Sequence, residues 1–118
     1  MIDFELTAEE KAKIDEAHEV ALKYFRPVSR YYDENEHEEP QDIIDMMWDK
    51  RGKGFVSGLG VVGAMVCEEL CWGDAGLYLA TPGPGLGGAA VFASGTKEQW
   101  GKFLARFNEG KPKWAPWP

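Results

Sequence analysis

The fold is decided by the stretch EELCWGDAGLYLATPGPGLGGAAVFASGTKEQW, residues 68–100. Its first part reads as the end of a nearly all-apolar helix that stops at Gly73, and Asp74 is placed to cap a helix that follows. The glycine- and proline-rich residues 81–88 then interrupt the chain, and Gly95 separates the next apolar segment from the last one. This order predicts short, closely packed helices and not strands.

Two capping boxes mark helix starts near the two ends of the chain. Thr7 is followed three residues later by Glu10, and Thr96 by Gln99, so that each pair can exchange side-chain and backbone hydrogen bonds. Apolar residues recur at helical spacing after each box, namely Ile14, Ala17, Ala21, Phe25 and Val28 in the first case and Trp100, Phe103, Leu104 and Phe107 in the second. We therefore expect a long amphipathic first helix and a final helix that ends near Gly110.

The middle of the chain predicts two further helices. Pro27 lacks a backbone donor and should either kink the first helix or mark its last regular turn, with residues 30–33 able to continue past the bend. The acidic residues 33–39 should form a solvated hinge. Pro40 suits the first turn of a helix with an apolar face at Ile43, Ile44, Met47 and Trp48. Residues 61–72 are apolar almost all round, which is typical of a helix buried among others.

The prediction is an all-α fold, an orthogonal or up-down helical bundle over residues 1–112, with a short tail at residues 113–118. The expected core consists of Ile14, Phe25, Ile44, Trp48, Val62, Val66, Leu70, Trp100, Leu104 and Phe107.

Charge and length exclude several classes of function. The chain has 118 residues, enough for one domain, and a formal net charge of −7, which disfavours nucleic acids and anionic lipid as partners. No apolar stretch approaches the ~20 residues of a membrane span, and the acidic start is unlike a targeting peptide. We expect a cytoplasmic protein, or a mitochondrial-matrix protein in a eukaryote.

Residues with chemical potential are few, and each has a structural explanation. Cys67 and Cys71 are four apart on one predicted helix face, where ordinary buried thiols are favoured over a metal or redox site. His18 and His37 share no helical face with another ligand type, which favours a solvated or lightly packed role.

Two further patterns are compatible with a binding or catalytic role. Residues 83–88 match G-x-G-x-x-G, but the preceding segment is helical in pattern, so a dinucleotide site is disfavoured. Glu68 and Glu69 lie among apolar residues, and an ion pair between packed helices explains them at least as well as catalysis. The residues alone therefore predict no catalytic set and no metal site.

The order of the motifs resembles the amino-terminal helical domain of the acyl-CoA dehydrogenase family of flavoenzymes. The resemblance is carried by E-E-L-x-W-G-D-A at residues 68–75, the apolar glycine-rich segment after it, and G-T-x-E-Q-x-x-K-F-L at residues 95–104. Residues 5–10 and 26–33 are similar to the opening helix of the family, and residues 58–60 to its glycine-rich turn, although the connection before that turn is shorter here. The similarity thus spans almost the whole chain.

The resemblance implies that the full-length enzyme removes an α-proton from an acyl-CoA, transfers a β-hydride to FAD and is reoxidised by electron-transfer flavoprotein. It places Tyr78, Leu79 and Pro82 in the wall of the acyl-chain cavity, although a plain core fits these residues equally well. The flavin-binding T-E-P-G-x-G-S-D motif and the catalytic Glu of the family have no counterpart in this sequence. The chain alone is therefore expected to hold no FAD tightly and to be inactive.

Two functions follow as alternatives. The chain is either the amino-terminal domain or a fragment of an acyl-CoA dehydrogenase, or a non-enzymatic helical module. The module would self-associate or bind a complementing subunit through its apolar faces.

Overall fold

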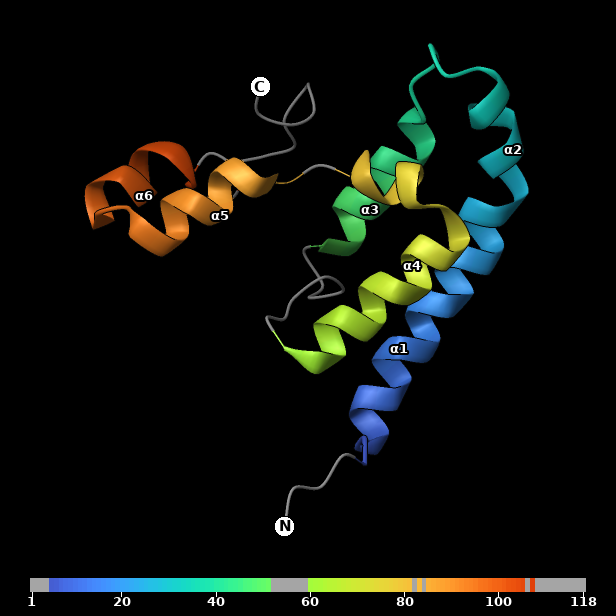
Figure 1. Cartoon of the computed structure of the whole chain (residues 1–118), viewed down its shortest axis with the longest axis horizontal. Coiled ribbons are helices and arrows are strands. Elements are labelled where there is room, and N and C mark those ends of the chain that lie inside the picture. The colour runs from blue at the N-terminus through green and yellow to red at the C-terminus, as the bar shows by residue number, and fades with distance from the viewer. Residues whose placement is uncertain (1–4, 52–59, 82, 84, 106, 108–118) are drawn as a thin grey trace. The chain divides into compact units, whose positions relative to one another are not determined.

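The computed structural model describes residues 5–51, 60–81, 83, 85–105 and 107 (Figure 1). It divides into two compact units, Met1–Leu79 and Ala80–Pro118, which are considered separately. The first holds α1 (Ala8–Val20), the π-helical turn η1 (Ala21–Phe25), α2 (Arg26–Glu34), α3 (Gln41–Arg51) and α4 (Val61–Leu79), and the second α5 (Gly85–Ser94) and α6 (Lys97–Phe103). All regular structure in the described residues is helical, which confirms the all-α prediction.

The presence of two compact units neither confirms nor contradicts the single domain predicted for residues 1–112. A single domain over residues 1–112 stays a prediction, and the expected tail, residues 113–118, lies outside the described residues.

The capping box at Thr7 forms as the sequence predicts. The Glu10 N–H donates to Thr7 Oγ1 at 3.2 Å, and the Thr7 N–H donates to Glu10 Oε2 at 2.8 Å. The Thr7 N–H bond is also the main reason that the pKa of Glu10 is lowered, because it stabilises the carboxylate. The first helix is thus anchored at its start by two mutually satisfied backbone donors.

Just before Pro27, the first helix contains one π-helical turn, residues 21–25. The Arg26 N–H donates to the Ala21 carbonyl five residues earlier, which makes residues 21–25 one turn of π-helix. Pro27 itself sits in the first turn of α2, where a missing N–H costs little. Helical structure therefore runs from α1 through η1 into α2 (Figure 1), and the expected kink is the π turn.

The acidic segment forms the expected solvated connection. Asp33 and Glu34 still belong to α2, and residues 35–40 form an exposed or half-buried loop before α3. The Tyr31 hydroxyl donates to Glu38 Oε2 at 2.7 Å and ties the loop back to α2. At the start of α4, the Gly60 carbonyl accepts the Ala64 N–H at 3.1 Å, while Gly60 has a φ of 141° that favours glycine.

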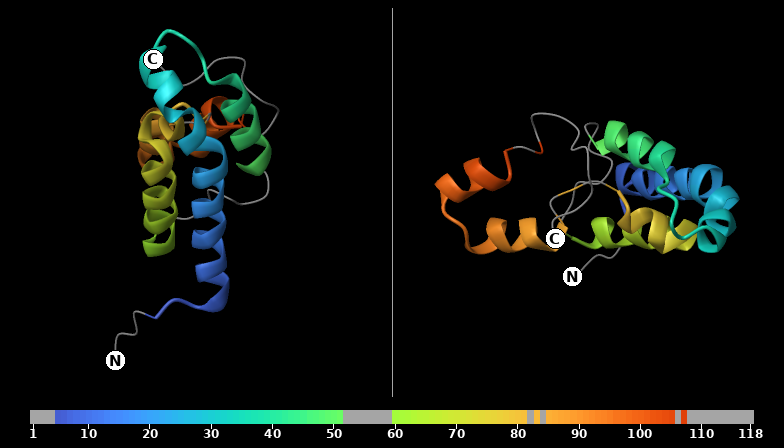
Figure 2. Two further views of the ribbon diagram at one scale, coloured as in Figure 1. Left: turned by 90° about the vertical axis from the view of Figure 1, so that its right-hand side faces the viewer. Right: turned by 90° about the horizontal axis from the view of Figure 1, so that it is seen from above.

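Two helices of the first unit approach each other closely at a glycine. A Cβ built on Gly73 would lie 2.7 Å from Ala21 Cβ, which is too near for a real contact, and 3.0 Å from Phe25 Cβ, which is tighter than most Cβ contacts. Ala21, Phe25 and Gly73 are all buried. The backbone of α4 therefore packs directly against η1, and Figure 2 shows α4 running beside the first helix in views turned by 90°.

The core of the first unit lies between these helices. Its buried members are Ala17, Val20, Phe25, Ile43, Met47, Val66, Leu70 and Leu77. Three residues of the predicted core, Phe25, Val66 and Leu70, are buried, and Ile14 and Val62 pack against them from partly buried positions. On α3 the prediction was wrong, because Ile44 and Trp48 are only half-buried. The apolar face of α3 is wide, and the edge formed by Ile43 and Met47 faces the core.

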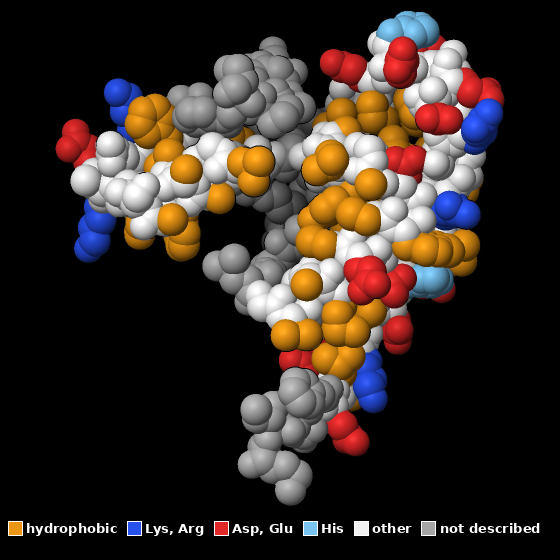
Figure 3. Space-filling model, in the orientation of Figure 1, with side chains coloured by type: hydrophobic (Ala, Val, Ile, Leu, Met, Phe, Trp, Pro, Cys, Tyr) orange, Lys and Arg blue, Asp and Glu red, His pale blue; other side chains and the backbone are white. Residues whose placement is uncertain are grey.

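The expectation that α4 is buried all round is also wrong. Val61 is 72% exposed and Trp72 46% exposed, because α1, η1 and α2 cover one side of α4 and leave another open. Figure 3 shows apolar side chains gathered on the open face of this unit.

The second unit is a pair of helices joined at Gly95. The Gly95 N–H and the Trp100 Nε1–H both donate to the Val91 carbonyl at 2.8 Å, and the Phe92 and Trp100 rings stack with centroids 5.2 Å apart. A Cβ on Gly95 would lie 2.3 Å from that carbonyl oxygen, so the turn requires glycine. Thr96 accepts the Gln99 N–H at 3.3 Å in the predicted capping box.

The core predicted for this unit is not fully buried. Trp100 is 36% exposed, and Leu104 and Phe107 are half-buried, because two short helices cannot enclose a stripe of large side chains. α6 ends at Phe103, and Phe107 is again helical, while the predicted helix end at Gly110 lies outside the described residues.

Gly73→Ala tests the close approach of α4 to η1. We expect it to lower the free energy of unfolding by about 1–3 kcal/mol, because the added methyl group forces the helix backbones apart. Urea unfolding followed by circular dichroism measures this effect. Gly101→Ala is the matched control, since a Cβ there meets no atom within 4 Å; an equal loss in both variants would contradict the explanation.

Candidate functional site

α4 bends at Asp74, as the sequence predicts. Asp74 has extended backbone angles, φ −172° and ψ 118°, in the middle of the helix. Its Oδ1 accepts the Leu77 N–H at 2.8 Å, which caps the final turn of α4, and its Oδ2 accepts a hydrogen bond from the Ser29 hydroxyl of α2. One carboxylate thus starts the last turn of α4 and ties it to α2.

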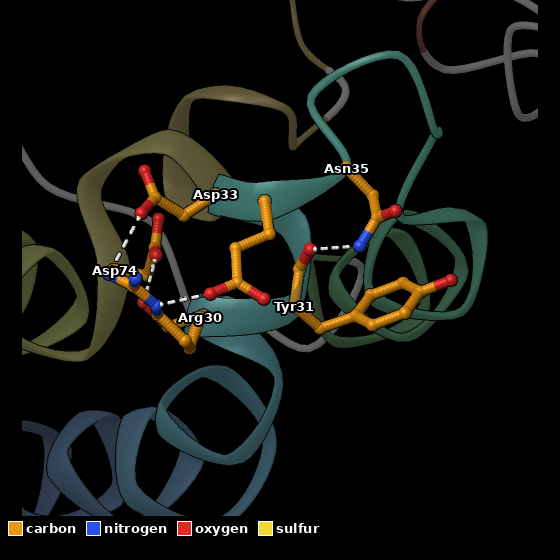
Figure 4. A network of polar contacts seen from close by, with 7 residues as sticks. Arg30, Tyr31, Asp33, Asn35 and Asp74 are labelled. Atoms are coloured by element: carbon orange, nitrogen blue, oxygen red, sulfur yellow. Dashed lines mark hydrogen bonds and ion pairs between the residues drawn. The ribbon is translucent and has the colours of Figure 1, made fainter.

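The polar groups on α2 next to this bend stabilise the helix. Figure 4 shows Arg30 between acidic side chains, with Nε 2.8 Å from Glu34 Oε1 and Nη1 3.4 Å from Asp33 Oδ2. Asn35 Nδ2 donates to the Tyr31 carbonyl at 2.9 Å and closes the end of α2. These groups are exposed and paired within one helix, so they form no secluded catalytic set.

The bend places Tyr78 back along the first part of α4. Its Oη lies 3.0 Å from Cys67 Sγ, and the side chain packs against the core from a half-buried position. Burial, and next the hydrogen bond with Cys67, raise the pKa of the Tyr78 phenol well above its ordinary value. Tyr78 is therefore a neutral hydroxyl at physiological pH, suited to hydrogen bonding and not to proton abstraction.

Leu79, the neighbouring predicted wall residue, does not pack with Tyr78. Leu79 is 76% exposed at the end of α4, while Tyr78 turns inward. Pro82 lies outside the described residues. Within the described part of the chain, Tyr78 is thus the single predicted wall residue that packs into the core.

The glycine motif, residues 83–88, overlaps the start of α5. α4 ends at Leu79, and α5 begins at Gly85, which has a φ of 54°. A dinucleotide site requires a strand before such a loop, and the segment before this loop is helical as expected.

A cluster between α1 and α4 was missed in the sequence. His18 Nδ1 lies 2.7 Å from Glu69 Oε2, and the His18 ring stacks on Trp72 with centroids 4.7 Å apart. The guanidinium of Arg26 lies 5.1 Å from the centroid of the Trp72 ring. A side-chain contact between packed helices is thus present at Glu69, whereas Glu68 is exposed. No short-range spacing could reveal it, because His18 and Glu69 are 51 residues apart.

The cysteines differ from the expected buried thiols. Cys67 is half-buried, and Cys71 is exposed on the open side of α4. Among the described residues, no three His, Cys, Asp or Glu side chains lie close enough to hold a metal ion together. A closed zinc site, which needs four ligands, is therefore not formed by this part of the chain.

Comparison with known proteins assigns no family to the chain. No family model, no curated protein and no solved structure matches it significantly. In the described residues, no helix combines the length and apolar character needed to cross a bilayer.

The raised pKa of Tyr78 predicts a loss of stability at alkaline pH. Because the folded pKa exceeds the unfolded value of about 10, the contribution of Tyr78 is complete below that pH and is lost as pH rises through the folded pKa. We expect Tyr78→Phe to reduce the fall in stability above pH ~10. Urea unfolding at several alkaline pH values measures it.

Tyr24→Phe is the matched control, since Tyr24 is an exposed tyrosine of the same unit. Identical alkaline stability profiles for the parent and Tyr78→Phe would contradict the assignment.

Proposed function

We propose that this chain is the amino-terminal helical domain, or a fragment containing it, of an FAD-dependent acyl-CoA dehydrogenase. The observation that supports the proposal is the bend of α4 within the E-E-L-x-W-G-D-A motif. Gly73 allows the close packing there, and Asp74 caps the next turn, so the motif has a structural reason for its residues. The glycine-rich α5 and the Thr96-capped α6 then follow in the order that the resemblance requires.

The chain contributes structure to this function, and no chemical step is assigned to its residues. FAD would supply hydride acceptance in the full-length enzyme. Tyr78 would form part of the wall around the acyl group, with its core-packed ring as the apolar surface. We place the enzyme in the cytoplasm, or in the mitochondrial matrix of a eukaryote, with electron-transfer flavoprotein as its oxidant.

The open apolar faces support a domain that is normally covered by other segments. Leu79 and Val61 of α4 are largely exposed, and Leu86 of α5 is 92% exposed. Exposed apolar surface of this kind is typical of an interface. The same faces also favour the second candidate, a non-enzymatic helical module that self-associates or binds a complementing subunit.

A chimeric enzyme distinguishes the two candidates. Residues 1–112 would replace the amino-terminal helical domain of a characterised acyl-CoA dehydrogenase, and bound flavin absorbance and acyl-CoA oxidation would be measured with an artificial electron acceptor. We expect flavin retention and turnover, because the helices present the face that the remainder of the enzyme covers. The same chimera with Gly73→Ala is the matched control and should lose much of its flavin and turnover.

A folded chimera without flavin or turnover would overturn the enzyme proposal. The module would then be the better explanation, and light scattering of the isolated chain would test self-association directly.

The isolated chain should neither hold FAD tightly nor oxidise acyl-CoA. A single wall residue buries far less than the 70% or so of ligand surface that is typical of a binding site. Purified chain is mixed with FAD, acyl-CoA thioesters of several lengths and an electron acceptor, and flavin absorbance and acceptor reduction are recorded. Stoichiometric flavin together with turnover would show that this expectation is wrong and would direct attention to Glu69.

A further inference from the structure

Two thiols share one side of the first part of α4. Cys67 and Cys71 are free and lie four residues apart, before the bend at Asp74. Residues at this spacing on a helix have Cβ atoms about 5–6 Å apart. Rotation about the Cα–Cβ bonds can therefore bring the sulfur atoms to the ~4.6 Å that two collinear metal–sulfur bonds of ~2.3 Å require.

The two thiols differ in burial and would therefore contribute differently to a metal site. Cys67 is half-buried and held beside the Tyr78 hydroxyl at 3.0 Å, so its position is fixed by the bend of α4. Cys71 is exposed, so an ion can reach its thiol from solvent. A phenol near a thiolate can donate to it and stabilise its charge.

The two thiols and the Tyr78 phenol also influence one another electrostatically. Partial burial of the sulfur raises the pKa of Cys71, and the neighbouring Cys67 raises it further. Both cysteines also contribute, after burial, to the raised pKa of Tyr78. The contact that fixes this geometry is the 3.0 Å between Cys67 Sγ and Tyr78 Oη, and Cys71 lies one helical turn further along α4.

The ligand number selects the kind of ion. No third His, Cys, Asp or Glu joins the pair among the described residues, so the four-ligand requirement of zinc is not met. Thiolates are soft ligands and favour Cu(I) among the biological metals, and a closed-shell monovalent ion is satisfied by two of them.

We propose that Cys67 and Cys71 form a two-thiolate binding site for Cu(I), with Tyr78 as the residue that positions Cys67. Binding is an exchange of ligands and not a redox step: one Cu(I) forms two bonds to sulfur, and two thiol protons pass to solvent. The site shares Tyr78 with the wall proposed for the acyl group, but Cu(I) binding and acyl-CoA oxidation are measured separately, so the failure of one proposal can be told from the failure of the other.

The experiment is an anaerobic competition between the full chain and a chromogenic Cu(I) chelator. We expect one Cu(I) per chain. Cys67→Ser and Cys71→Ser should each weaken binding at least ~100-fold, because one thiolate cannot hold the ion alone. Tyr78→Phe should weaken it by about 10-fold, as is usual when a group supporting a ligand is removed.

The pH dependence gives a second readout. Because two protons leave for each ion bound, the affinity should rise ~100-fold per pH unit in the range where both thiols are protonated. Zn(II) in the same competition format should bind far more weakly than Cu(I).

Controls separate loss of the site from loss of the fold. Circular dichroism of each Cys→Ser variant must match the parent, and Ser94→Ala, on the other unit, should leave Cu(I) affinity unchanged. Retention of parental affinity by Cys71→Ser would overturn the proposal. So would a stoichiometry of one Cu(I) for two chains, since the thiols would then come from different molecules.

Discussion

The first unit depends on the contact between Gly73 and η1. Without a side chain at residue 73, the backbone of α4 comes within reach of Ala21 and Phe25, and the bend at Asp74 follows immediately. Ala21 also supplies the carbonyl that closes the π turn. The π turn and the bend at Asp74 thus lie beside this close contact. A small residue on each helix, Ala21 and Gly73, lets the two backbones approach each other.

The contact between Gly73 and η1 links the π turn at residues 21–25 to the bend at Asp74. The π turn absorbs the missing donor of Pro27 and lets α2 continue from the first helix, so that Ser29 reaches Asp74. Asp74 then caps the final turn of α4, and that turn carries Tyr78 back to Cys67. A helix without the bend would place Tyr78 about three turns away from Cys67. The arrangement around Tyr78 is therefore a consequence of packing at Gly73.

Local signals in the sequence predicted local structure well. The boxes at Thr7 and Thr96 and the cap at Asp74 were identified because each involves residues three apart. Burial was harder to predict, as Ile44 and Trp48 show, because an apolar face does not reveal which of its edges meets the core. Trp100 shows a second reason, since burial needs a neighbour that the short second unit does not supply.

The candidate sites could be predicted least, because they join residues from different helices. His18 and Glu69 meet across α1 and α4, and Ser29 meets Asp74 across α2 and α4. Tyr78 was singled out through a resemblance, but its thiol neighbour depends on the bend. The same bend leaves Leu79 facing outward while Tyr78 packs inward. An acyl group covered by further segments would contact Tyr78, whereas a protein partner would contact Leu79. The two proposed functions therefore differ in which face of the last turn of α4 is occupied.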